Sequence, residues 1–415
     1  MKRSNVFQNT AMLYIMSFAK LILPLLTMPY LTRVLSEDSY GFMAYVRSCM
    51  TYMQLIIDFG FILSSVKDIV NAKDDKRQIG TIAGNTFLAK SILCVIAAIV
   101  TFIMCFAIDI LKLDIFYVVL SFVSVATTIF LADFLFRGIE KMHYITIIFL
   151  ITKSISTILT FILVKNDDTM MWIPVLEILA HIISIAISIG ILKKLEIKIR
   201  VSNIKDSLIM IKDSFVYFLS SVATTAFAAL NTVLIGIFIE DLTQIAYWSL
   251  CLSITSAIQG LYSPITNSVY PYMIKERSLS FIHKILLIFM PIVTAGCIIC
   301  FVFADFAMLV VGGEKYLEAA ELFRYFVPIL FFSFPAQIYG WPTLGAIGQV
   351  KETTISTIIA ALLQVVGIVF LVLINQFTLV HLAVLRLITE ASLMGVRMLI
   401  TYRNKNAFYI KTSNI

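Results

Sequence analysis

The sequence predicts an all-α membrane protein that crosses the bilayer many times, and three observations lead to this prediction. Of the 415 residues, 60% are hydrophobic and only 14% are charged, and the mean hydropathy is +0.96. Soluble domains carry about 25% charged residues. Runs of about 20 apolar residues, long enough for a helix to cross the hydrocarbon core, recur along the whole chain. A membrane β-barrel would instead show shorter, alternating segments.

Apolar runs and the polar breaks between them define twelve predicted spans. The first run is too long for a signal peptide and lacks a small-residue cleavage site, so we interpret it as the first span. The spans are expected at residues 9–32, 41–66, 81–108, 114–136, 144–164, 170–192, 215–239, 244–272, 284–311, 322–349, 353–374 and 379–401.

The loops between these spans differ sharply in positive charge. The termini and even-numbered loops hold 21 Lys and Arg residues, whereas the odd-numbered loops and their edges hold 5: Arg33, Lys112, Lys165, Lys315 and Arg324. The positive-inside rule therefore places both termini in the cytoplasm. Basic loops facing an anionic leaflet also explain the net charge of +7 without a nucleic acid partner.

A polar stretch near the middle of the chain divides it into two halves. In residues 193–214, apolar and charged side chains alternate, which is typical of a segment lying at the membrane surface. We therefore predict an N-terminal six-helix lobe (1–192), a cytoplasmic amphipathic linker (193–214) and a C-terminal six-helix lobe (215–415).

Four cations lie within predicted spans of the first half: Lys20, Arg47, Lys90 and Lys153. An ionised side chain at the bilayer centre costs at least about 2.5–3.5 kcal/mol, so these groups are expected to face a watery cavity or an opposite charge. Lys20 and Lys153 lie roughly 14 Å from the predicted cytoplasmic edge, too far for a lysine stem to reach water. We interpret the four as candidate anion-binding residues, with Arg47 close enough to the outer edge to reach water instead.

Acidic and histidine side chains lie on the same predicted helices. Asp58 follows Gln54 by one turn on the second span, and Glu177 precedes His181 by one turn on the sixth. These groups could pair with the lysines, or they could titrate and couple proton movement to transport. Glu177 and His181 have the spacing of a metal pair, but no third ligand accompanies them, so we expect no metal site.

The second half carries few charges at membrane depth. Arg386, Glu390 and Arg397 share one face of the last span, and the spacing of the first two favours an internal ion pair over a ligand site. Asp133 and Arg137 have the same spacing and the same interpretation. The sequence holds no nucleotide-binding motif and no catalytic constellation, so we expect neither a cofactor nor an enzyme.

Several segments resemble a known family. "NTAMLYIMSFAKLILPLLTMPYLTRVLSEDSYG" (Asn9–Gly41) is similar to the opening of Wzx-type polysaccharide-repeat (O-antigen) flippases, in which a P-Y-L-x-R-x-L segment ends the first span and a Y-G pair starts the second. "DFGF" (Asp58–Phe61), "FLFRGIEKMHYIT" (Phe134–Thr146) and "GGEKYLEAAELFR" (Gly312–Arg324) resemble later landmarks of that family. The resemblance extends across the chain.

This resemblance implies the fold of the MOP (multidrug/oligosaccharidyl-lipid/polysaccharide) exporter superfamily, with two six-helix lobes around a central cavity. It implies flipping of undecaprenyl-pyrophosphate-linked oligosaccharide from the cytoplasmic to the periplasmic leaflet of the bacterial inner membrane, for O-antigen, lipopolysaccharide or a related polysaccharide. A polysaccharide polymerase and a chain-length regulator would be partners besides the lipid bilayer. The family has no strict binding motif, so the candidate residues of the first half rest on helical faces. Each of five predicted spans carries one stripe of polar side chains, and these stripes contain Lys20, Arg47 with Asp58, Lys90, Lys153, and Glu177 with His181.

Two other functions remain open at this point. A MATE-like exporter on the same fold would couple small-molecule export to sodium or protons, and a preference for cationic drugs would favour acidic cavity residues over lysines. A membrane glycan polymerase would carry a large periplasmic loop with arginines and histidines. The longest predicted outside loop has only about a dozen residues.

The predicted topology can be tested by thiol labelling. A cysteine replacing Asn166 should react with a membrane-impermeant reagent added outside the cell, and one replacing Asn203 should react only after the membrane is opened. The control is a chain whose six native cysteines, all within predicted spans, are replaced by serine. Labelling in the reverse sense would overturn the topology.

Overall fold

Helices make up the structure along the whole described chain. The computed structural model describes residues 3–73 and 75–408, without the side chains of residues 3–11, 13, 220 and 223–228, and these ranges contain no β-strand. Ten of the described helical segments are long and apolar enough to cross a membrane. The predicted class, an all-α protein that spans the membrane many times, is confirmed.

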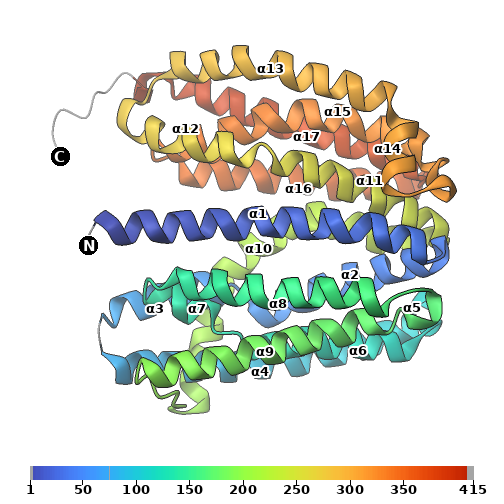
Figure 1. The fold of residues 1–415 in the computed structure, drawn as a ribbon. Coiled ribbons are helices and arrows are strands. Elements are labelled where there is room, and N and C mark those ends of the chain that lie inside the picture. Colours follow the sequence, from blue (N-terminus) through green and yellow to red (C-terminus); the bar gives the residue numbers. More distant parts are fainter. Residues whose placement is uncertain (1–2, 74, 409–415) are drawn as a thin grey trace. The chain divides into compact units, whose positions relative to one another are not determined.

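The chain divides into two compact units, an N-terminal unit (Met1–Thr225) and a C-terminal unit (Ala226–Ile415). The helices before the linker (Figure 1) are α1 (Arg3–Val34), α2 (Glu37–Asp58), α3 (Phe61–Asn71), α4 (Lys76–Ala107), α5 (Asp109–Lys112), α6 (Ile115–Thr127), η1 (Thr128–Phe130), α7 (Asp133–Gly138), α8 (Met142–Leu163), η2 (Asp167–Thr169) and α9 (Trp172–Lys194).

One long helix, α10 (Ile204–Phe238), contains the boundary between the two units. It is followed by α11 (Leu242–Gly260), α12 (Ser263–Glu276), α13 (Leu279–Val302), α14 (Ala304–Val311), η3 (Glu314–Tyr316), α15 (Ala319–Ile338), η4 (Tyr339–Gly345), α16 (Val350–Leu373), α17 (Leu379–Arg403) and η5 (Lys405–Phe408).

Each of the twelve predicted spans falls on one of these helices or on a broken helix. The ten membrane-length segments match ten of them. The other two, 215–239 and 244–272, fall on the second part of α10 and on α11 with α12. The second predicted span breaks into α2 and α3 at Phe59 and Gly60, which both have positive φ (40° and 80°).

Short polar side chains begin many of the helices. Asp75 accepts hydrogen bonds from the backbone N–H groups of Arg77 and Gln78 at the start of α4, and Asp114 accepts one from Tyr117 at the start of α6. Such caps satisfy donors that the first helical turn leaves free. Each of these two helices therefore begins directly after its capping aspartate.

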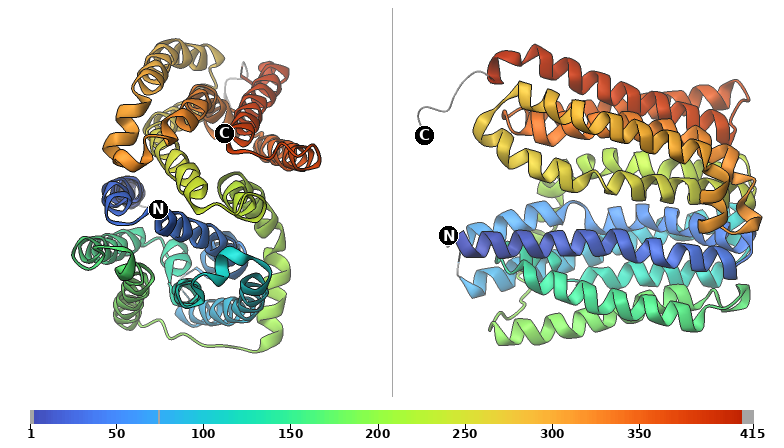
Figure 2. Two further views of the ribbon diagram at one scale, coloured as in Figure 1. Left: turned by 90° about the vertical axis from the view of Figure 1, so that its right-hand side faces the viewer. Right: turned by 45° about the horizontal axis from the view of Figure 1, so that its top comes forward.

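The N-terminal unit contains a ring of packed helices. Around this ring, α1 packs along α8, α8 along α9, α9 along α6 and α6 along α2. A contact between α2 and α1 closes the ring. These helices run nearly parallel or antiparallel to one another in both views of Figure 2. The helix α4 packs on α2 from outside the ring. Polar faces of different helices can therefore meet inside the ring.

The predicted linker, residues 193–214, belongs to the N-terminal unit. It comprises the last residues of α9, a non-helical segment and the first turns of α10. Within it, the backbone N–H of Arg200 donates to the carbonyl of Gly80 on α4 at 3.1 Å. The functional boundaries of the two lobes and the linker stay a prediction.

In the C-terminal unit, α15 packs against α11, α13, α14 and α17. Trp248 on α11 is fully buried and meets the ring of Phe326 edge-on, with 4.8 Å between the ring centroids. Arg397 on α17 donates to the carbonyl of Ala336 at 2.7 Å and to the hydroxyls of Ser356 and Thr357, both at 3.1 Å. One guanidinium thus joins α17, α15 and α16.

Replacing Arg397 by methionine should destabilise the protein by roughly 3–5 kcal/mol, because three charge-assisted hydrogen bonds between helices are lost. Thermal unfolding in detergent measures this as a lower midpoint. Arg403→Met, which removes an exposed arginine at the end of the same helix, is the matched control. Equal midpoints for the two variants would contradict the assigned role.

Candidate functional site

A polar pocket of about 340 Å³ lies inside the helix ring of the N-terminal unit. Side chains from α1, α2, α6, η1, α7, α8 and α9 line it, and we call it the ring pocket. Its charged and polar lining residues are Lys20, Gln54, Ser124, Thr128, Asp133, Thr152, Lys153, Glu177, His181, Ser184 and Ser188. Four of the sequence-predicted candidates therefore share one pocket: Lys20, Lys153, Glu177 and His181.

Lys20 extends from α1 into the ring pocket. Its ammonium lies 5.3 Å from the ring centroid of Phe149 on α8, within the range of a cation–π contact. It is attracted to Asp133 at the start of α7 and repelled by Arg137. The side chain is exposed and lines the pocket, so a ligand can reach it.

Lys153 and Glu177 face each other across α8 and α9. The Lys153 ammonium lies 3.8 Å from a carboxylate oxygen of Glu177, and both side chains are more than one-third exposed. This separation exceeds the usual 2.7–3.2 Å of an N–H···O hydrogen bond. The attraction is therefore electrostatic, and the lysine keeps its donors available.

His181 is oriented by the backbone of α6. Its Nδ1 lies 3.1 Å from the carbonyl oxygen of Ser124 and 2.8 Å from the hydroxyl of Thr127. Since a carbonyl only accepts, Nδ1 carries the proton and Nε2 of the neutral ring is an acceptor. The Ser124 hydroxyl donates to Glu177 at 3.3 Å. Ser124 therefore contacts both His181, through its carbonyl, and Glu177, through its hydroxyl.

Lys90 and Asp58 form an ion pair beside the ring pocket. Their charged atoms lie 2.8 Å apart, and the Lys90 side chain is 8% exposed. The amide of Gln54 donates to the other oxygen of Asp58 at 2.6 Å and accepts from Thr128 at 3.1 Å. Because Gln54 and Thr128 line the ring pocket, the ion pair supports its wall.

The remaining candidates lie elsewhere. Arg47 is exposed on α2 and is not among the residues of the ring pocket. Arg386 and Glu390 lie on α17 in the C-terminal unit, where the buried guanidinium and the carboxylate attract each other. A role of these three residues in binding or coupling stays a prediction.

Asp133 was expected to form an ion pair with Arg137, and the structure shows an electrostatic attraction between the two without a close contact. Among the ion pairs of residues 3–73 and 75–408, none joins these two side chains, and Asp133 lines the ring pocket. Asp133 is the first residue of α7, and the spacing in sequence gave no sign that this helix start lines a pocket. No group of three metal-ligating side chains occurs in the part of the chain that the structure describes.

Solved structures of low sequence identity share this fold. "Lipid II flippase MurJ, inward closed conformation" superposes with a TM-score of 0.73 and 15% identity, covering 95% of this chain and 88% of that one. An inward-facing multidrug resistance MATE transporter of the MOP superfamily has a TM-score of 0.69 and 15% identity, covering 95% of this chain and 100% of that one. The fold is therefore that of a multi-pass membrane transporter.

The sequence places the chain within this class. The family described as "Polysaccharide biosynthesis protein" matches residues 6–276, well over half of the chain, and the protein belongs to this family. A protein of Escherichia coli (strain K12) named "Putative O-antigen transporter" is 25% identical over 412 residues, which cover 96% of this chain and 97% of that protein. A Shigella dysenteriae protein of the same name is 26% identical over 279 residues, 67% of this chain and 70% of that one. The predicted family resemblance is confirmed.

Asp58→Asn should destabilise the protein by about 1–3 kcal/mol, because the buried Lys90 ammonium loses its counter-charge while solvent, which reaches the 41% exposed Asp58 side chain, replaces part of it. The double variant Asp58→Asn/Lys90→Met should recover most of this loss, since it removes the buried charge as well. Thermal unfolding in detergent measures both effects.

The exposed ion pair of Asp109 and Lys112, at 2.5 Å, is the matched control. Asp109→Asn should cost less than about 1 kcal/mol, because solvent screens that pair. A double variant at 58 and 90 that is less stable than Asp58→Asn alone would contradict the assigned role of the Lys90–Asp58 pair.

Proposed function

We propose that this protein flips undecaprenyl-pyrophosphate-linked oligosaccharide repeat units from the cytoplasmic to the periplasmic leaflet of the inner membrane, for O-antigen or a related surface polysaccharide. The observation that carries the proposal is the ring pocket, which presents Lys20 and Lys153 inside the membrane-spanning bundle of a polysaccharide biosynthesis protein. Names of relatives support the same class of cargo. The protein acts by transport and carries out no covalent step.

The two lysines suit a phosphate ligand. Hydrogen bonds from an ammonium to a phosphate oxygen are short and about twice as strong as neutral ones. Lys153 lies beyond hydrogen-bond distance of Glu177, so a phosphate oxygen can take the lysine's donors without first breaking a close ion pair. Lys20 lies in the same pocket on a different helix, so the two cations can hold one anionic group from two sides.

The pocket volume limits what it holds. Pockets of about 300–1,000 Å³ take a drug-sized ligand, and this one lies at the lower end. It therefore accommodates the phosphates and the first sugar, while the rest of the oligosaccharide lies outside it and the prenyl chain stays in the lipid. Movement of the two lobes would then expose the bound head group to one side of the membrane and afterwards to the other.

A second function, ion-coupled export of a small molecule, is favoured by one specific observation. Asp133 and Glu177 line the same pocket as the lysines, with His181 beside Glu177. Carboxylates and a histidine in a membrane bundle could take up and release protons. In the flippase proposal, these groups balance the two lysines when the pocket holds no phosphate.

Complementation distinguishes the two functions. Expression of the wild-type chain, with its matching glycan genes, in a strain that lacks its own repeat-unit flippase should restore surface glycan. Lys20→Gln/Lys153→Gln should lower display at least about tenfold, because two charge-assisted contacts to phosphate are lost.

Lys205→Gln, which removes an exposed lysine at the start of α10, is the control at matched protein level. Normal glycan display in the double variant would refute the anion site. Drug resistance conferred by the wild-type chain without restored glycan would favour the exporter.

A further inference from the structure

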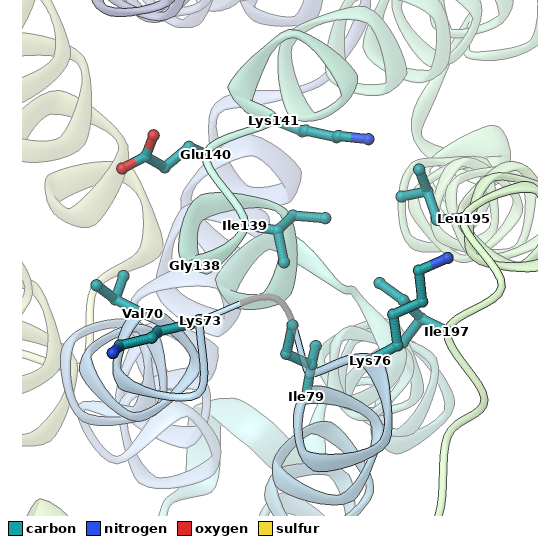
Figure 3. Close-up of a pocket in the computed structure, with 10 residues that line it drawn as sticks. All are labelled: Val70, Lys73, Lys76, Ile79, Gly138, Ile139, Glu140, Lys141, Leu195 and Ile197. Atoms are coloured by element: carbon teal, nitrogen blue, oxygen red, sulfur yellow. The ribbon is translucent and has the colours of Figure 1, made fainter. Parts of the chain in front are cut away.

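A second pocket, of about 350 Å³, lies at one end of the N-terminal unit and is separate from the ring pocket. Loop and helix-end residues from three places form it: the turn between α3 and α4, the turn between α7 and α8, and the segment after α9 (Figure 3). Its charged residues include Lys73, Lys76 and Lys141, and its apolar residues include Ile79, Ile139 and Ile197. We call it the end pocket.

The end pocket lies at the level where membrane spans end. Five membrane-length segments begin or end beside it: Glu37–Asn71, Lys76–Ala107, Ile115–Gly138, Met142–Leu163 and Asp167–Lys194. Residues at such positions lie among the lipid head groups. The positive-inside rule assigns this lysine-rich end to the cytoplasmic side.

The walls of the end pocket are held by close contacts. The Lys76 ammonium lies 2.7 Å from a carboxylate oxygen of Glu196, which ties the segment after α9 to the start of α4. A β-carbon on Gly80 would lie 2.1 Å from the carbonyl oxygen of Lys198, so only glycine permits this approach. A β-carbon on Gly138 would lie 2.5 Å from a side-chain carbon of Ile69. The cavity between these elements is therefore built into the fold.

Two ammonium groups lie on one side of the end pocket. Figure 3 shows Lys76 and Lys141 both extending toward Leu195, whereas Lys73 and Glu140 lie on the opposite side of Ile139. The hydrogen bond from Lys76 lowers the pKa of the Glu196 carboxyl, so Glu196 is ionised at neutral pH and balances one charge. Among the described residues, Lys141 forms no ion pair.

We propose that the end pocket binds the phosphate head group of an anionic phospholipid, with Lys76 and Lys141 donating to the phosphate oxygens. Lys76 has three N–H donors and keeps Glu196 while it donates to the ligand. Val70, which is exposed, and Ile139, which is half-buried, contact the glycerol and the first methylenes of the lipid chains. The site goes beyond the proposed transport cycle and does not depend on it.

A lipid fits this pocket better than a soluble phosphate. Val70, which lines the pocket, is 51% exposed. Further along the segment after α9, Ile199 and Val201 are 40% and 54% exposed and line a separate apolar pocket between α4 and α9. Apolar side chains left exposed at head-group level are in contact with lipid chains. A ligand that carries both a phosphate and acyl chains satisfies the lysines and these side chains together.

Lipid retention by the purified full-length protein tests the proposal. Native mass spectrometry in detergent would compare retained phosphatidylglycerol with phosphatidylcholine of the same acyl chains, and the wild type should retain the former at least about fivefold more strongly. Each lysine near an anionic lipid surface contributes about fivefold in affinity. Lys141→Gln should therefore weaken retention about fivefold, and Lys141→Arg should keep it.

The control variant is Lys193→Gln/Lys194→Gln, which removes two exposed lysines at the end of α9 that do not line the pocket. It should retain the lipid as the wild type does. Lys141→Gln breaks no ion pair among the described residues, so its folding should be unaffected, and its thermal midpoint without lipid confirms this.

Two results would overturn the proposal. One is equal phosphatidylglycerol retention by Lys141→Gln and the wild type. The other is that glycerol 3-phosphate or inorganic phosphate at millimolar concentration displaces the lipid completely, which would assign the pocket to a soluble phosphate.

Discussion

The ion pair between Lys90 and Asp58 is the interaction on which the interior of the N-terminal unit depends. An ammonium that is 8% exposed within a membrane-spanning helix is stable only with a counter-charge close by, and the carboxylate lies at 2.8 Å. The pair joins α4 to α2, and Gln54 extends the hydrogen bonds from Asp58 to Thr128 in the pocket wall. The Lys90 charge would be unfavourable in the membrane without a partner. Paired with Asp58, it instead helps to position polar groups of α4, α2 and η1.

The N-terminal unit uses its buried and accessible lysines differently. Lys90 is occupied by a close carboxylate, whereas Lys20 and Lys153 lie in a pocket with acids that are near but not in close contact. Strong pairing stabilises the bundle, and loose pairing leaves donors for a ligand. The same distinction separates Lys76 from Lys141 at the end of the unit, where only Lys76 has a carboxylate partner among the described residues.

Much of the candidate site could be predicted from helical faces. Lys20, Lys153, Glu177 and His181 were singled out because polar side chains repeat with the helical period on apolar segments, and all four line one pocket. The same reasoning did not predict where Asp133 and Arg47 lie relative to the pocket. The spacing of Asp133 and Arg137 suits a local pair, yet Asp133, at the start of α7, lines the pocket and makes no close ion pair with Arg137 among the described residues. Arg47 lies on the same helix as Gln54 but outside the pocket lining.

The sequence by itself determined the class of protein, the positions of the spans and the helices that carry polar faces. Hydropathy and charge act locally, within a stretch of about 20 residues, so they can be read without knowing which helices are neighbours. Only the tertiary structure decided which polar faces meet, that Lys90 takes Asp58, and that loops far apart in the chain enclose the end pocket. Those outcomes depend on helix breaks such as Phe59–Gly60 and on contacts between distant segments, which no local pattern encodes.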